Sequence, residues 1–142
     1  MLEQKEYTII EKKKFLNQFY WVTKELEELE EKLKRLTIKI QEVKVSDFSL
    51  SPKGGPSTDM IDLLSQKEKY QNLLAKKIVK IENIRLQIET ALDNLEDSRL
   101  RLILKYKYLQ NYSYKEIASK LNKSERHIRR LHDIAIRIIE IA

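Results

Sequence analysis

The stretch YKEIASKLNKSERHIRRLHDIAI, residues 114–136, has the pattern of two helices joined by a tight turn. Ser113 stands directly before it and Glu116 follows three residues after that serine, which is the capping-box pattern of a helix start. Asn122 readily adopts the left-handed backbone conformation that ends a helix, and Ser124 can cap the helix that follows. A short helix, a turn and a second, basic helix predict a helix-turn-helix.

Apolar residues recur at spacings of three and four in both of these helices, which defines an inner face for each. This face contains Ile117, Ala118 and Leu121 in the first helix, and Ile128, Leu131, Ala135 and Ile138 in the second. A rotation of about 100° per residue places charged side chains on the opposite side of the second helix. They are Arg126, Arg129, Arg130, Asp133 and Arg137. We therefore expect this side to face away from the core.

The net charge is concentrated in the last third of the chain. Residues 98–142 hold 11 Lys and Arg against 4 Asp and Glu, a net charge of +7. Residues 1–97 hold 17 Lys and Arg against 18 Asp and Glu, a net charge of −1. A basic segment joined to a near-neutral one indicates a polyanionic partner, most simply a nucleic acid.

Strong helix breakers are confined to one place, because both prolines and both glycines lie in SPKGGPS, residues 51–57. The long stretches on either side can therefore be helical. Apolar residues in the first stretch are spaced alternately by four and three: Phe15, Phe19, Val22, Leu26, Leu29, Leu33, Leu36, Ile40 and Val43. Thr58 or Asp59 can cap the second. There the stripe continues with Met60, Leu63, Tyr70, Leu74, Ile81, Ile84, Ile88, Ala91 and Leu95, and Lys67 and Lys77 interrupt it.

Such a narrow heptad stripe is typical of a coiled coil. Two helices of similar length favour an antiparallel hairpin with arms of roughly 50–60 Å, and a parallel dimer of the first helix is the competing arrangement. We predict an all-α fold. A long antiparallel helical hairpin (coiled coil) occupies residues 1–97, with a turn at 45–58, and a helix-turn-helix DNA-binding domain occupies residues 98–142.

The run quoted first, together with the preceding LILKYKYLQNYS, resembles the helix-turn-helix of sigma-70 region 4 over about residues 98–139. With an N-terminal coiled coil and 142 residues, the chain is also similar to small phage regulators, the ArpU and RinA type of late-gene activator. The resemblance implies a sequence-specific regulator that binds duplex DNA and reads the major groove with the helix starting at Ser124. The other sigma regions are missing, so a complete sigma factor is not expected.

Carried over position by position, the resemblance implies that five residues face the major groove: Ser124, Glu125, Arg126, Arg129 and Arg130. Arginine can contact guanine with two hydrogen bonds, and glutamate can accept from the cytosine amino group. Three other basic residues are better placed for phosphates: Lys115, Lys123 and Arg137. His127 lies at the edge of the inner face, where it contacts the DNA backbone or packs. The competing interpretation is a solvated basic helix.

We expect double-stranded DNA as the partner, and a homodimer formed through the hairpin or the C-terminal helix. Two alternatives stay open. One is a coiled-coil adaptor that docks on RNA polymerase, and the other is a DNA-packaging component of the small-terminase kind, which also joins a helix-turn-helix to helices.

Several classes of function are not expected. The chain has no cysteine, so thiol chemistry and disulfides are excluded. No apolar run reaches the roughly 18 residues that a membrane span needs, and a cytoplasmic protein is the default. His127 and His132 are five residues apart and point in different directions on a helix, so they do not form a metal site. We predict no enzyme activity and no cofactor.

Overall fold

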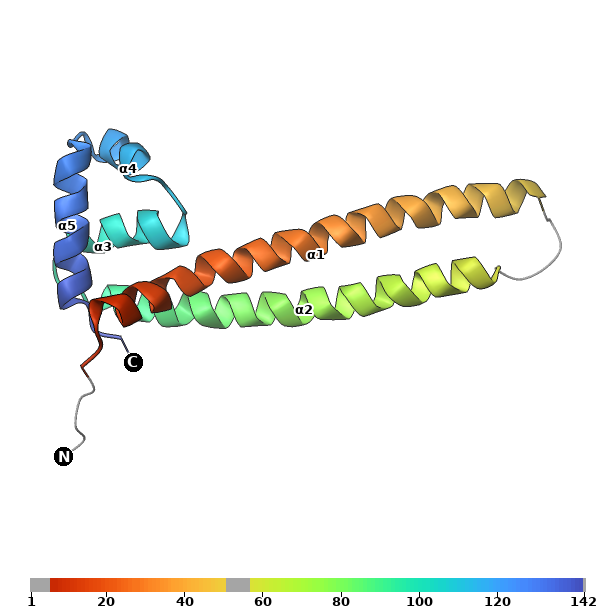
Figure 1. The fold of residues 1–142 in the computed structure, drawn as a ribbon, viewed down its shortest axis with the longest axis horizontal. Coiled ribbons are helices and arrows are strands. Elements are labelled where there is room, and N and C mark those ends of the chain that lie inside the picture. The colour runs from red at the N-terminus through yellow and green to blue at the C-terminus, as the bar shows by residue number, and fades with distance from the viewer. Residues whose placement is uncertain (1–5, 51–56, 142) are drawn as a thin grey trace, which may run out of the picture. The chain divides into compact units, whose positions relative to one another are not determined.

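The computed structural model describes residues 6–50 and 57–141, and within these ranges every regular element is a helix. In chain order they are α1 (Ile9–Leu50), α2 (Thr58–Asp93), α3 (Ser98–Leu104), the π-helix η1 (Lys105–Leu109), α4 (Tyr114–Leu121) and α5 (Glu125–Ile138) (Figure 1). The all-α prediction is confirmed. None of the described helices is both long and apolar enough to cross a membrane.

Contacts divide the chain into two compact units. Unit 1 comprises Met1–Val22 together with Ile81–Ala142, and unit 2 comprises Thr23–Lys80. Unit 1 thus contains the predicted helix-turn-helix, the start of α1 and the end of α2. The predicted boundary at residue 97 separates a helical hairpin from a DNA-binding domain, whereas the two units are defined by contacts. That boundary therefore stays a prediction.

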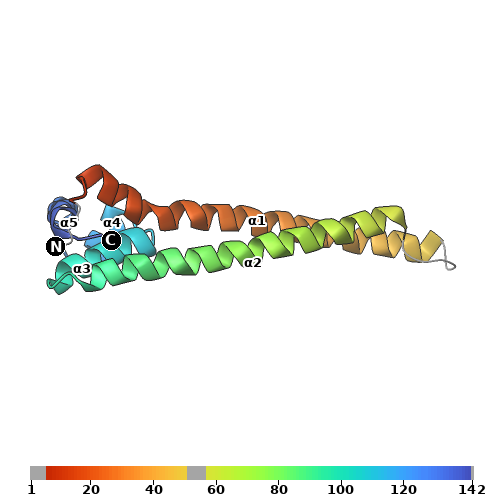
Figure 2. The same cartoon turned by 90° about the horizontal axis from the view of Figure 1, so that it is seen from below.

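The two arms of unit 2 run antiparallel. Leu36 and Ile40 of α1 form a buried cluster with Met60 of α2. Farther along the arms, Glu25 of α1 forms an ion pair with Lys77 of α2 at 2.6 Å. Because lower numbers on α1 meet higher numbers on α2, the helices have opposite directions, and Figure 2 shows them side by side. Three partly buried side chains pack against the cluster: Val43, Leu63 and Tyr70.

The burial of α1 and α2 follows the predicted heptad stripe. Every stripe position named for either helix is buried or partly buried, and most of the residues between them are exposed. Lys67 and Lys77, which interrupt the stripe, are partly buried as well. The apolar spacing therefore identified the packed face of both helices, whereas supercoiling of the arms stays a prediction.

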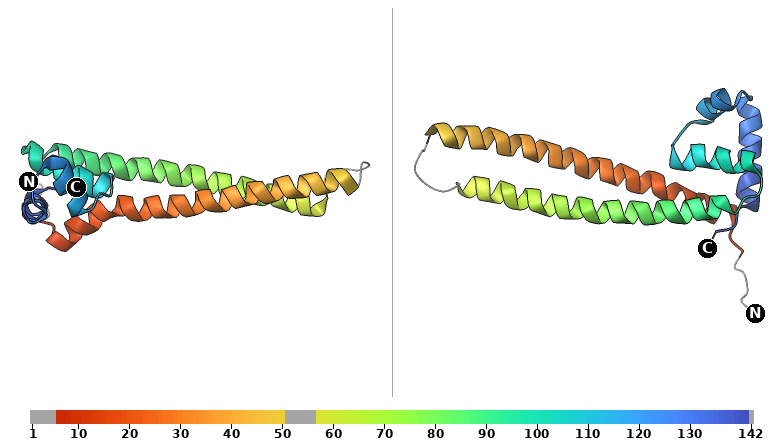
Figure 3. Two further views of the ribbon diagram at one scale, coloured as in Figure 1. Left: turned by 90° about the horizontal axis from the view of Figure 1, so that it is seen from above. Right: turned by 180° about the vertical axis from the view of Figure 1, so that it is seen from behind.

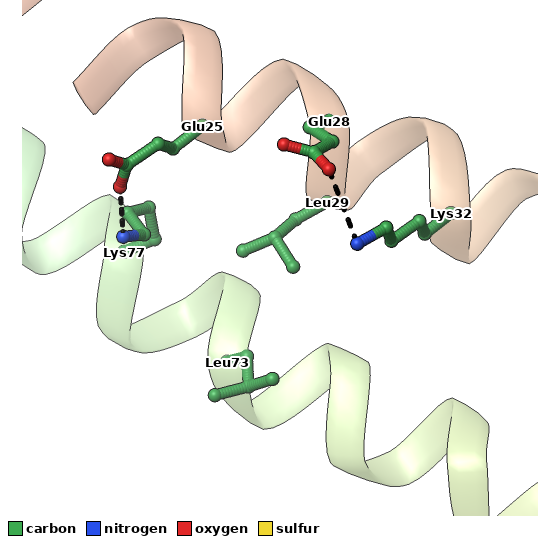
Figure 4. Close-up of a pocket in the computed structure, with 6 residues that line it drawn as sticks. All are labelled: Glu25, Glu28, Leu29, Lys32, Leu73 and Lys77. Atoms are coloured by element: carbon green, nitrogen blue, oxygen red, sulfur yellow. Dashed lines mark hydrogen bonds and ion pairs between the residues drawn. The ribbon is translucent and has the colours of Figure 1, made fainter. Parts of the chain in front are cut away.

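Lys77 interrupts the apolar stripe of α2, and its charge is neutralised by an ion pair. Its side chain is 23% exposed and reaches Glu25 at 2.6 Å, while Lys32 pairs with Glu28 at 3.3 Å on the neighbouring turn. Leu29 and the residues of these two pairs line a hollow between the arms (Figure 4). The hydrogen bond and the charge of Lys77 lower the pKa of the Glu25 carboxyl. The lysine therefore lies in the seam with its charge paired.

Two predicted helix ends need correction. The turn was predicted to start at residue 45, but α1 continues to Leu50. Residues 45–50 contain neither glycine nor proline, so nothing in them ends the helix. The cap of α2 is Ser57 rather than Thr58 or Asp59, because the Ser57 hydroxyl accepts a hydrogen bond from the Met60 N–H at 3.1 Å.

Unit 1 is built around α5, which packs on both α3 and α4, while η1 contacts α3 and α4 (Figures 1 and 3). Fully buried side chains come from nearly every element: Leu16, Ile88, Leu92, Ile103, Leu104, Ile117, Ile128, Ile136, Ile139 and His132. The start of α1 also contacts the end of α5, where the Lys12 ammonium donates a hydrogen bond to the Arg137 carbonyl at 2.9 Å. The first turns of α1 therefore belong to the same packed unit as the last helix.

Candidate nucleic-acid interface

The turn between α4 and α5 has the local chemistry that the sequence predicted. The Ser113 hydroxyl accepts a hydrogen bond from the Glu116 N–H, and the Ser124 hydroxyl accepts one from the His127 N–H, both at 3.1 Å. Asn122 is left-handed, with φ 54° and ψ 44°. The Lys123 N–H then bonds back to the Ala118 carbonyl at 3.0 Å, which closes the end of α4. The bonds of Lys123 and Ser124 lie at the turn itself, and they fix the direction in which α5 leaves it.

The buried side of α5 is wider than predicted. Ile128, Leu131 and Ala135 are buried, but Ile138 is 53% exposed, so that part of the predicted stripe is wrong. Three other residues are buried in its place: His132, Ile136 and Ile139. The reason is that α5 packs on α3 as well as on α4. A helix that packs against two other helices buries a wider part of its circumference than a single apolar stripe occupies.

The predicted contact residues lie on the accessible side of the turn and of α5, apart from Lys115 near the start of α4. The exposed ones are Lys115, Lys123, Ser124, Glu125, Arg126, Arg129, Arg130 and Arg137. His127 is partly buried, as expected for the edge of the inner face. This arrangement presents a basic helix to solvent. Contact of these residues with DNA stays a prediction.

The three central arginines differ in how they are held. Arg129 forms an ion pair with Glu125 at 2.9 Å. The Arg130 guanidinium donates to the His127 Nδ1 at 3.2 Å. Within the described ranges, Arg126 has no hydrogen bond or ion pair from its side chain. Arg126 is therefore the most available of the three for a ligand, and Arg129 is the most restrained.

A buried histidine whose position the sequence did not predict anchors α5. The His132 side chain is 1% exposed, and its Nε2 lies 2.6 Å from the Tyr108 hydroxyl. Its Nδ1 lies 3.1 Å from a carboxylate oxygen of Asp133. A carboxylate only accepts, so the ring proton belongs on Nδ1, and Nε2 accepts from Tyr108. Burial lowers the pKa of His132 below its ordinary value, so folding favours the neutral imidazole.

This burial predicts that unit 1 loses stability in mild acid. As the pH falls through about 6.5, the unfolded chain binds a proton at His132 that the folded chain does not bind, so unfolding becomes more favourable. One such proton changes the free energy of unfolding by at most about 1.4 kcal/mol per pH unit. Urea unfolding at pH 7.5, 6.5 and 5.5 measures the slope. A slope that persists unchanged in His132→Gln would contradict the assignment.

Comparison with known families supports a class of domain for this part of the chain. Residues 82–139 match the family model described as Sigma-70, region 4. The match begins within α2 and includes α3, η1, α4 and α5. No curated protein and no solved structure matches the chain. Residues 82–139 are therefore similar to the sigma-70 region 4 helix-turn-helix, which is a DNA-binding domain.

Proposed function

We propose that the chain is a sequence-specific, double-stranded DNA-binding transcriptional regulator encoded by a phage or another mobile element. The observation that carries the proposal is the capped, left-handed turn at Asn122, after which α5 keeps Ile128 inside and Arg126 outside. The net charge of +7 over residues 98–142 and the match to sigma-70 region 4 support the same function. The likeness to ArpU and RinA activators suggests late-gene control.

In this proposal the first turns of α5 enter the major groove. Arg126 and Arg130 contact base edges, and Glu125 accepts a hydrogen bond from a cytosine amino group. Ser124 and His127 lie beside them at the start of the helix. Lys115, Lys123 and Arg137 contact phosphates, which contribute affinity and orientation without carrying sequence information.

We also propose that unit 2 joins two copies of the chain, so that two helix-turn-helix domains reach two half-sites. Supporting this, four exposed apolar side chains that α2 contributes to unit 2 lie within a sector of about 100°. They are Ile61 (52% exposed), Leu64 (45%), Ile78 (45%) and Val79 (61%), while Leu73 (40%) lies outside this sector. Apolar side chains grouped on one side of an arm favour self-association. RNA polymerase is a further proposed partner.

Two measurements test the proposed function. Fluorescence anisotropy with random duplex DNA in low salt is expected to show binding, and selection from a random library is expected to enrich one sequence. Absence of any binding would favour the coiled-coil adaptor. Mass measurement in solution is expected to give a dimer, whereas a ring of many subunits would favour the DNA-packaging component.

A further inference from the structure

Two cations meet at one aromatic ring beside the turn. Tyr114 is the first residue of α4, and the centroid of its ring lies 4.2 Å from the Lys107 Nζ. The guanidinium carbon of Arg129 lies 4.4 Å from the same centroid. The two charges are therefore no farther apart than these two distances together. They come from different elements, since Lys107 belongs to η1 and Arg129 to α5.

The charge of Lys107 is not balanced by an acid. Among the described residues, no carboxylate forms an ion pair with it, whereas Lys105 in the same π-helix pairs with Asp93 at 3.4 Å. Partial burial lowers the pKa of Lys107, and the nearby charge of Arg129 lowers it further. Arg129 has its own acid in Glu125. Lys107 is thus a partly buried cation whose charge is repelled by that of a second cation on the same ring.

An anion placed against both groups would relieve this repulsion and form charge-assisted hydrogen bonds with both. In helix-turn-helix docking the first helix crosses the DNA backbone, and Tyr114 begins that helix. The anion nearest to this position is a phosphodiester. Lys107 lies in η1, which directly precedes this part of the chain, and not on α5.

We propose that Lys107 and Arg129 together bind one backbone phosphate of DNA, with the Tyr114 ring holding both cations in place. The proposal rests on the proposed DNA-binding function and adds a binding residue outside α5. It also changes the role assigned to Arg129. Restrained by Glu125 and Tyr114, Arg129 positions the protein on the backbone, and base reading falls to Arg126, Arg130 and Glu125.

The test compares Lys107→Gln with Lys105→Gln, which removes the same charge from the same π-helix. Affinity for the selected duplex is measured by anisotropy at several salt concentrations. Loss of one phosphate contact lowers the slope of log affinity against log salt by about 1. We expect this in Lys107→Gln, with several-fold weaker binding and an unchanged ranking of base-substituted duplexes. Lys105→Gln is expected to keep the wild-type slope.

Phosphate ethylation interference gives a second readout. In the wild type, ethylation of one phosphate is expected to block binding through this site, and both Lys107→Gln and Arg129→Gln should lose that signal while the other positions remain. Equal slopes in the two lysine variants, with an unchanged interference pattern, would overturn the proposal. Circular dichroism and thermal unfolding check that each variant is folded.

The two failures can be told apart. If the wild type binds no duplex DNA, the proposed function fails. If the wild type binds and selects a sequence, but Lys107→Gln behaves like Lys105→Gln, only the phosphate site fails and the function stands.

Discussion

Replacing Arg126 and Arg130 together with alanine is expected to weaken binding to the selected duplex by about 30-fold or more. Each arginine that contacts a base edge contributes about 1–3 kcal/mol of discrimination, and both side chains point away from the core of unit 1. The preference for the selected sequence over random DNA should fall with the affinity. Anisotropy titrations against both duplexes measure the two effects.

The matched control removes two other arginines, through Arg85→Ala with Arg99→Ala. Arg85 pairs with Glu82 and Glu89 on α2, and Arg99 pairs with Asp97 at the start of α3. The net charge changes by the same amount, so a general electrostatic effect would weaken both double variants equally. Equal loss in the two double variants, or no loss in either, would refute α5 as the recognition helix.

Ile128→Ala is expected to destabilise unit 1 by about 2–5 kcal/mol, the usual range for truncating a buried isoleucine. Its side chain is fully buried on the inner face of α5. A loss of this size is a large fraction of the 5–15 kcal/mol that typically stabilises a domain. Because the same helix carries the proposed DNA contacts, binding should fail as the fold is lost. Denaturant unfolding and the binding titration report the two losses separately.

Ile138→Ala is the control on the same helix. Its side chain is 53% exposed, so truncation is expected to change the free energy of unfolding by no more than about 0.5 kcal/mol. A destabilisation equal to that of Ile128→Ala would mean that Ile138 packs inside, as the apolar spacing alone predicted.

Features governed by neighbouring residues could be predicted from the sequence. The left-handed turn at Asn122 and the serine caps of α4 and α5 depend on side chains that bond to backbone groups within a few residues. The heptad stripe of α1 likewise marked the packed face, because its spacing is a property of one helix. Each of these features depends only on residues that are close together in the sequence.

Features that depend on distant partners were missed. Leu16 looked like a residue between two stripe positions, yet it is fully buried in unit 1. His132 lies on the inner face because Tyr108, 24 residues earlier, provides a hydroxyl for its ring. Lys107 gains its position from η1 and Tyr114, and no periodic pattern signals a π-helix. In the sequence, the burial of His132 is indicated only by its position four residues after Ile128, which lies on the inner face of the same helix.

The hydrogen bond from Lys12 to the Arg137 carbonyl joins residues 125 positions apart in the chain. A ribosome adds about 5–20 residues per second, so the first turns of α1 exist for on the order of ten seconds before α5 is made. During that interval Leu16, which is fully buried in the finished unit 1, precedes the C-terminal segment of the same unit. Contacts of such long sequence separation also slow folding, because closing a long loop costs conformational entropy before the contacts compensate for it. Unit 1 can therefore be completed only late in the synthesis of this protein, and the start of α1 has to remain available until the C-terminal segment is made.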